Sequence, residues 1–95
     1  MERLHILGVE AEVARSFAER ARGLIGRRSL APGCGLLIER CNAIHTFFMR
    51  FPIDATFLDR QNRVVKTVRN IHPWRLLVWG GWRAAKVLET EARHG

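Results

Sequence analysis

The stretch CNAIHTFFMRFPIDATFLD, residues 41–59, decides the fold of this 95-residue chain. Its apolar residues lie in two runs, on either side of a break at Phe51–Pro52. Proline has no amide to donate to a strand ladder, so it belongs at the end of a strand or in a loop. The stretch is therefore expected to form two core strands, over residues 44–49 and 53–58.

The chain beyond this stretch predicts a hairpin, a loop and a last strand. DRQN, residues 59–62, has the composition of a hairpin tip, and RVVKTVRNI, residues 63–71, would be the return strand. HPWRLLVWGGWR, residues 72–83, is irregular and apolar and is expected to be a loop folded over the core. AAKVLETEA, residues 84–92, is expected to be the last strand.

The chain before the stretch predicts two strands around one short helix. A period of two from Val9 onward favours a half-buried strand, and the apolar run Leu36–Ile38 follows turn residues and favours another. Between them, Ser16 and Glu19 have the spacing of a capping box, and Gly23 is a natural end for the helix. We expect this helix to carry Phe17, Ala18 and Ala21 inward. A longer helix beginning near Val9 is the alternative.

Composition bounds the class of protein. The net charge is +7, and 14 of the 16 basic residues are arginine, since only Lys66 and Lys86 are lysine. Arginine grips phosphate or carboxylate with two parallel hydrogen bonds, although long arginine side chains also simply cover apolar surface. No apolar run reaches about 18 residues and the start has no export signal, so a cytoplasmic protein without a membrane span is expected. Cys34 and Cys41 are then expected to be reduced thiols.

Three motifs, in the right order, resemble a known family. They are RGLIGR at residues 22–27, the segment from His45 to Asp59, and Val87-Leu88-Glu89. Together they resemble domain-of-unknown-function family 192, over about residues 9–95. The resemblance implies an α+β, mostly β fold, with a small barrel-like antiparallel or mixed sheet and one or two short helices. It implies no established activity.

The resemblance has two departures. Phe48 stands where the family often has tryptophan, and the chain stops at Gly95, where members continue into another turn and strand. Residues 1–95 are therefore expected to be a single domain that lacks the family's last strand.

The candidate ligand site is a polar-rimmed pocket near the middle of the chain. Asp54 could pair with Arg50 or His45 at its rim, with Met49 on its apolar wall, because ligand pockets are mostly apolar with few placed polar groups. The alternatives are structural: Asp54 would accept backbone amides where its strand starts, and Met49 would be core. Asp59 is expected to shape the hairpin turn.

Glu89 is the second candidate for the pocket. It lies in an otherwise apolar strand, and a buried carboxylate must be paired or protonated. Arg50 and Arg22 are the expected partners of a structural ion pair, and the alternative role for Glu89 is contact with a ligand.

No metal site, cofactor or catalytic residue is predicted. Cys34, Cys41, His45 and His72 lack the paired spacing of structural zinc ligands. On one strand, Cys41 and His45 would lie about 13 Å apart, too far for a nucleophile and its base unless the chain turns between them. No nucleophile, base and orienting group form a recognisable pattern, so an enzyme ranks third among the possible functions.

The Trp segment, residues 72–83, and the basic helix end suggest a second surface. The residues that could serve nucleic acid or a protein partner are Arg22, Arg27, Arg28, Trp74, Trp79, Trp82 and Arg83. Aromatic and basic residues together suit stacking of nucleic-acid bases, and equally suit an apolar flap or a protein-docking patch. The sequence thus favours a binding module for a small ligand or protein partner, with a basic nucleic-acid-associated domain as the alternative.

Overall fold

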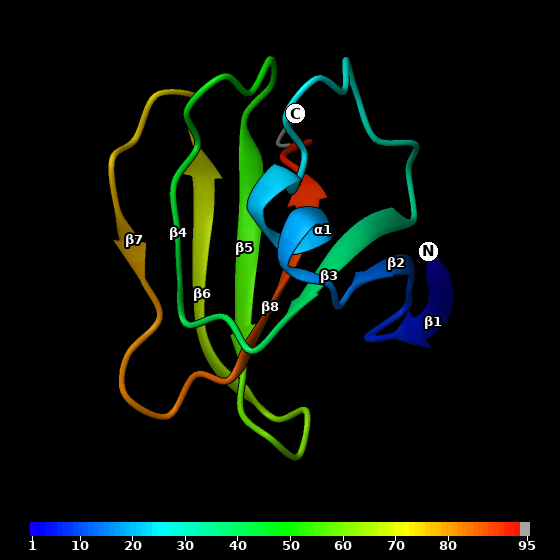
Figure 1. Ribbon diagram of the computed structural model, residues 1–95, viewed down its shortest axis with the longest axis vertical. Coiled ribbons are helices and arrows are strands. Elements are labelled where there is room, and N and C mark those ends of the chain that lie inside the picture. The colour runs from blue at the N-terminus through cyan, green and yellow to red at the C-terminus, as the bar shows by residue number, and fades with distance from the viewer. Residues whose placement is uncertain (94–95) are drawn as a thin grey trace.

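The computed structural model describes residues 1–93 and contains, within them, one helix and eight strands (Figure 1). In chain order these are β1 Glu2–Ile6, β2 Val9–Ala14, α1 Phe17–Arg22, β3 Cys34–Glu39, β4 Ala43–Ile44, β5 Ile53–Leu58, β6 Val64–Ile71, β7 Val78–Trp79 and β8 Lys86–Glu91. The mostly β, α+β class expected from the sequence is confirmed.

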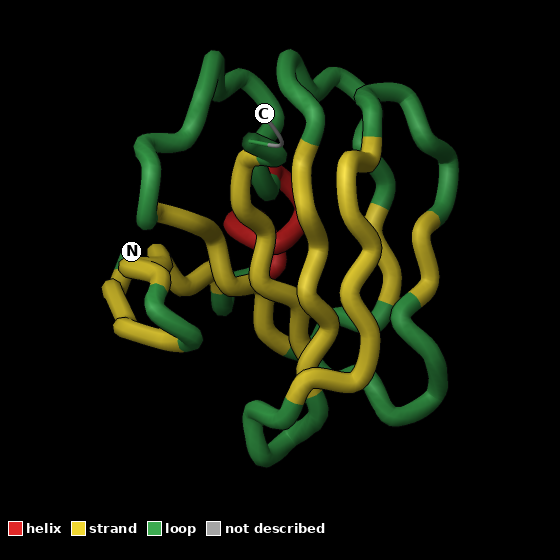
Figure 2. The backbone as a smooth tube through the Cα atoms, turned by 180° about the vertical axis from the view of Figure 1, so that it is seen from behind, coloured by secondary structure: helices red, strands yellow, loops and turns green. Residues whose placement is uncertain are grey.

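Six strands form one mixed sheet in the order β1-β2-β3-β8-β5-β6. Only β2 and β3 run parallel, and the other neighbours are antiparallel. The sheet curls but does not close, because β1 and β6 at its two edges are not paired with each other (Figure 2). The mixed sheet is thus confirmed, while the barrel it was expected to resemble stays open.

The hairpin of β5 and β6 follows the prediction from residues 53–71. Asp59 shapes its tip, since its Oδ1 accepts the amides of Gln61 and Arg63, each at 2.9 Å. These backbone hydrogen bonds and the nearby Arg63 guanidinium lower the pKa of the Asp59 carboxyl.

Strand β8 was expected at the end of the chain and lies in the middle of the sheet. It pairs with β3 on one side and β5 on the other. Alternate side chains enter two core clusters, with Val87 in one and Leu88 in the other. Both faces are therefore covered at this strand, which explains why Val87 and Leu88 are adjacent apolar residues.

The strand expected over residues 44–49 is largely wrong. The chain leaves the extended conformation after Ile44 because Thr46, which is 0% exposed, ties it to the Trp segment. The Thr46 Oγ1 donates to the carbonyl oxygen of His72 and accepts the amide of Arg75, each at 2.8 Å. These side-chain bonds to a distant segment take the place of a strand ladder.

The Trp segment folds over the core only in part, through Val78 and Gly80. Its strand β7 pairs with β4 in a separate two-stranded sheet, and Val78 is buried. Most of its large apolar side chains are exposed instead, namely Trp74, Leu76, Leu77, Trp79 and Trp82. Gly80 is where the segment meets the main core, since a Cβ there would lie 2.2 Å from Cδ1 of Phe57.

Helix α1 begins and ends where the sequence indicated. The Ser16 side chain accepts from the Glu19 amide and the Glu19 side chain accepts from the Ser16 amide, which is the predicted capping box, and Gly23 caps the end. The prediction that the helix carries Phe17, Ala18 and Ala21 inward is wrong, because no residue of α1 is buried and Phe17 is 82% exposed. The longer helix from Val9 is excluded by β2, and strand β1 was not predicted.

Candidate functional site

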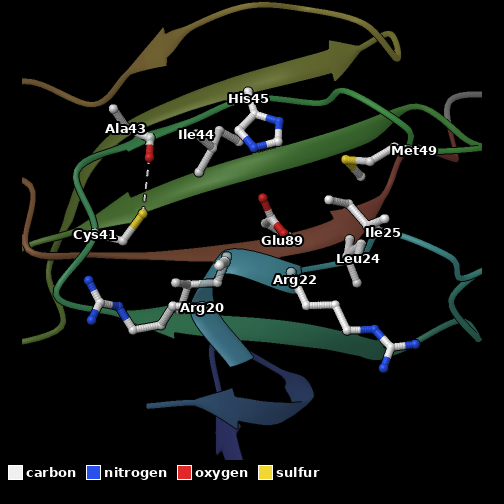
Figure 3. A pocket seen from close by; sticks show the side chains of 13 residues that line it. Arg20, Arg22, Leu24, Ile25, Cys41, Ala43, Ile44, His45, Met49 and Glu89 are labelled. Atoms are coloured by element: carbon white, nitrogen blue, oxygen red, sulfur yellow. Dashed lines mark hydrogen bonds between the residues drawn. The ribbon is translucent and has the colours of Figure 1, made fainter. Parts of the chain in front are cut away.

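A cavity of about 190 Å³ lies beneath α1 and the turn that follows it (Figure 3). Its lining comes from residues 20–25, from Ile38 of β3, from the segment 41–49 and from Glu89 of β8. Ala21, Arg22 and His45 are exposed, so the cavity opens to solvent between α1 and the segment after β4.

Glu89 provides a carboxyl group to this cavity. It lies two residues after Val87 on β8, on the face that carries the larger core cluster, and Figure 3 shows its side chain near Ile25 and His45. The residue is only 3% exposed. Within residues 1–93 its carboxyl makes no hydrogen bond or ion pair.

Burial alone raises the pKa of Glu89 to about 8, because an ionised carboxylate loses its hydration in the interior. The group is therefore mostly protonated at neutral pH. A protonated carboxyl has one O–H to donate and retains oxygen lone pairs that accept. The expected ion pair of Glu89 with Arg50 or Arg22 is wrong, since neither guanidinium is bonded to it.

Cys41 lies near Glu89 on the same cavity. Its Sγ donates to the carbonyl oxygen of Ala43 at 3.1 Å. Burial raises the pKa of the Cys41 thiol, and the nearby Glu89 carboxyl raises it further. Since the thiolate is the nucleophilic form, this cysteine is poorly suited to covalent chemistry at neutral pH.

His45 also lines the cavity and comes from the segment that follows β4. Its Nδ1 accepts the amide of Phe47 at 3.2 Å, which fixes the ring near the opening. The turn after β4 does bring Cys41 and His45 to one cavity. They form no thiol–imidazole hydrogen bond, because the thiol is bonded to Ala43.

The structure brings three of the five predicted ligand-site residues together. His45, Met49 and Glu89 line the cavity, whereas Arg50 and Asp54 do not. The Asp54 Oδ1 accepts the amide of Asn70 at 2.8 Å, joining β5 to β6.

The apolar walls of the cavity were not among the predicted site residues. Leu24 and Ile25 come from the turn after α1, and Ile38 comes from β3. Leu24 and Ile25 belong to the RGLIGR motif, which served in the sequence analysis only to support the family resemblance. Apolar residues after a helix give no indication of what they face.

The residues predicted for nucleic acid or a partner do not form one surface. Arg22 lies at the cavity, and Arg27 is paired with Glu12 at 3.2 Å, a bond that lowers the pKa of that carboxyl. Arg28 is exposed in the same loop. The other members lie on the Trp segment, where Trp74 packs against Phe48 and Trp79 packs against Trp82.

Two further observations concern the part of the chain that the structure describes. No cluster of three or more histidine, cysteine, aspartate or glutamate side chains there could hold a metal ion. No helix within it has the length and apolar character needed to cross a membrane.

Comparison with known proteins places this fold among uncharacterised relatives. The family model DUF192, "Uncharacterized ACR", matches residues 2–94. A UPF0127 protein of Pyrococcus abyssi and one of Pyrococcus horikoshii are each 40% identical over 75 residues, which is 73% of this chain. The matches cover 61% and 62% of those proteins, so the chain spans about three fifths of their length.

Two solved structures share the fold. A protein of unknown function from Novosphingobium aromaticivorans has a TM-score of 0.82 at 25% identity, over 88% of this chain and 64% of that one. A candidate transcription regulator from Sinorhizobium meliloti also has a TM-score of 0.82, at 24% identity, over 95% of this chain and 78% of that one. At the second identity the likeness concerns the fold alone.

Proposed function

The chain belongs to the DUF192 family of uncharacterised proteins, and we propose that it is a binding module whose cavity takes a small ligand through the carboxyl group of Glu89. The observation that carries the proposal is a carboxyl 3% exposed, beside an open cavity, without a bonded partner among residues 1–93. Burying a polar group without a hydrogen bond is costly, so such a group is expected to meet a partner that is not part of the chain.

The lining indicates what kind of molecule fits. Leu24, Ile25, Ile38 and Met49 offer apolar contact around the single buried carboxyl. A cavity of roughly 150 Å³ holds benzene, so the 190 Å³ here suits a slightly larger molecule. The ligand is then a compact, mostly apolar molecule with one group that exchanges hydrogen bonds with a protonated carboxyl.

Native mass spectrometry of the purified protein is the direct test. A small molecule that copurifies should appear as a mass adduct, and the adduct should disappear in Glu89→Leu, which removes the carboxyl and keeps the site apolar. Glu89→Gln keeps a hydrogen-bonding group of similar size, so part of the protein should still carry the adduct.

A matched pair of probes tests the same site when nothing copurifies. Benzyl alcohol and ethylbenzene have the same number of non-hydrogen atoms and differ in one hydroxyl. We expect benzyl alcohol to shift the NMR amide signals of Leu24, Cys41 and Glu89 at lower concentration than ethylbenzene does. Glu89→Leu should reverse this preference, because its site has nothing to bond the hydroxyl. An unchanged preference in Glu89→Leu, or no response of these amides to either probe, would overturn the proposal.

A further inference from the structure

Three loops meet at the end of the molecule that carries the hairpin tip (Figure 1). They are residues 40–42 after β3, residues 59–60 after the last residue of β5, Leu58, and residues 80–85 before β8. Backbone hydrogen bonds fasten them together: Cys41 N donates to Ala85 O at 3.0 Å, Ala85 N to Leu58 O at 2.7 Å, and Gly80 N to Asn42 O at 2.7 Å. The backbones of the three loops are therefore held close to one another.

Each of these loops contributes one arginine to a shared hollow. Arg40, Arg60 and Arg83 line a depression of about 350 Å³ together with Trp82. None of the described residues that line this hollow is an aspartate or a glutamate. Three like charges gathered without a carboxylate repel one another, and an anion placed among them relieves that repulsion.

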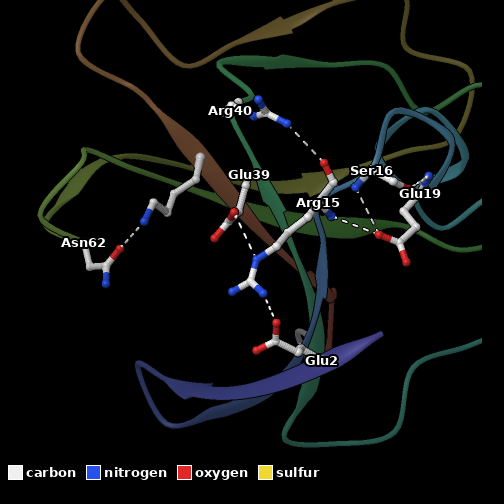
Figure 4. A network of polar contacts seen from close by, with 8 residues as sticks. Glu2, Arg15, Ser16, Glu19, Glu39, Arg40 and Asn62 are labelled. Atoms are coloured by element: carbon white, nitrogen blue, oxygen red, sulfur yellow. Dashed lines mark hydrogen bonds and ion pairs between the residues drawn. The ribbon is translucent and has the colours of Figure 1, made fainter.

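The three arginines have N–H groups that donate no hydrogen bond within residues 1–93. Within residues 1–93, Arg60 and Arg83 make no hydrogen bond or ion pair. Arg40 uses one nitrogen, donating to the carbonyl oxygen of Arg15 at 3.3 Å (Figure 4), and this bond holds its side chain in place. A guanidinium has five N–H donors, so all three can still bind an oxyanion.

Trp82 adds an aromatic surface to this charge. Its side chain is 88% exposed, and its ring packs edge-to-face with the Trp79 ring at a centroid distance of 5.1 Å. Arg60, Trp82 and Arg83 also line a second hollow of about 310 Å³ on the side of the hairpin tip, together with Gln61 and the ion pair of Asp59 with Arg63 at 2.8 Å. An exposed indole thus lies between two hollows that share the same two unbonded arginines.

From this arrangement we propose that Arg40, Arg60, Arg83 and Trp82 form a binding site for single-stranded nucleic acid. The guanidinium groups would bind successive phosphates, and an unpaired base would stack on the Trp82 ring. A duplex keeps its bases stacked on one another and has none free for the indole. The site is separate from the Glu89 carboxyl and goes beyond the proposed small-ligand function.

The test is fluorescence anisotropy of a labelled oligothymidylate, about ten nucleotides long, titrated with the intact chain at several salt concentrations. Each phosphate contact on a single strand contributes a slope of about −0.7 to the log–log salt dependence. Arg60→Gln and Arg83→Gln should each lower that slope by about 0.7 and weaken binding about eightfold at about 50 mM salt.

Trp82→Ala should weaken binding about tenfold without changing the slope, because stacking is not ionic. Trp82→Phe keeps an aromatic face and should recover most of the affinity. These side chains are exposed, so the variants should fold, and far-UV circular dichroism and thermal unfolding verify this.

Arg28→Gln is the matched control. It removes the same charge from an exposed side chain in the loop after α1, at the opposite end of the molecule (Figure 1). Its affinity and slope should stay close to those of the unmodified chain. If Arg28→Gln and Arg60→Gln lose affinity for the oligothymidylate equally and Trp82→Ala loses none, the binding is general attraction to a basic protein. That result would overturn the proposed site.

Thymidine 5′-monophosphate, used as a competitor, distinguishes the two sources of a nucleoside phosphate. We expect it to compete only at concentrations far above those of the oligonucleotide, because it offers one phosphate. Competition at equal nucleotide concentration would assign the site to a free nucleotide and contradict binding of a strand. Absence of oligothymidylate binding at low salt would overturn the proposal altogether.

Discussion

The Glu89 carboxyl has a measurable consequence for stability. Burial raises its pKa from an ordinary value of 4.5 to about 8. Between these two pH values the folded chain holds a proton that the unfolded chain has lost, so the free energy of unfolding falls as pH rises. One pKa unit corresponds to about 1.4 kcal/mol, so from pH 4.5 to pH 7 the loss is on the order of 3 kcal/mol.

Glu89→Gln should remove this pH dependence. The variant and the unmodified chain are expected to differ little near pH 4, and the variant should be the more stable by a few kcal/mol at pH 8. Urea unfolding of both proteins across this range is the measurement, and Cys41 and His45, which face the same cavity, are present in both. A constant difference between the two proteins at every pH would mean that Glu89 ionises as freely in the fold as outside it.

The sequence could indicate Glu89 but not its surroundings. An acidic residue that directly follows the apolar pair Val87-Leu88 in a predicted core strand already suggests a buried carboxyl. Whether an arginine reaches it depends on which segments cross that strand, and here the turn after α1 presents Leu24 and Ile25. Arg22 and Arg50 were plausible only because they are cations close to the motifs.

At the scale of elements, helix α1 depends on its cap. It is six residues long and none of them is buried, so packing contributes little to holding it. Ser16→Ala removes the acceptor for the Glu19 amide at 3.1 Å and should cost about 1 kcal/mol. Because residues 20–25 line the cavity, amide hydrogen exchange at these residues should also become faster.

Ser29→Ala is the control for this prediction. Ser29 is exposed in the loop after the helix, so its substitution should leave both stability and exchange nearly unchanged. Urea unfolding and NMR hydrogen exchange measure the two effects. Similar results for both variants would show that the capping box does not hold the helix.

Elements defined by local chemistry were predicted from the sequence, and those set by distant contacts were not. The capping box, the Asp59 turn and strands β5, β6 and β8 all carry their own short-range signals. Residues 45–49 look like a strand, yet Thr46 bonds to a segment about 30 residues away. No local pattern could reveal that competition.

At the scale of the whole molecule, sequence order and spatial order disagree. Strand β1, at one end of the chain, lies at the edge of the sheet and buries only Ile6. Strand β8, near the other end, lies between β3 and β5 and adds Val87 and Leu88 to the two core clusters. The sheet therefore cannot be completed until segments far apart in the chain have come together.

Removing each of these strands should have very different effects. Deleting residues 1–7 loses one edge ladder and one buried isoleucine, a cost on the order of 2–4 kcal/mol, which a domain of ordinary stability survives. Deleting residues 86–95 leaves β3 and β5 without their shared partner and opens both core clusters, so this chain should not fold. Far-UV circular dichroism and NMR signal dispersion distinguish the two results. A cooperative unfolding transition in the chain without β8 would mean that β3 and β5 can pair directly, and that the central position of β8 is not what holds the sheet together.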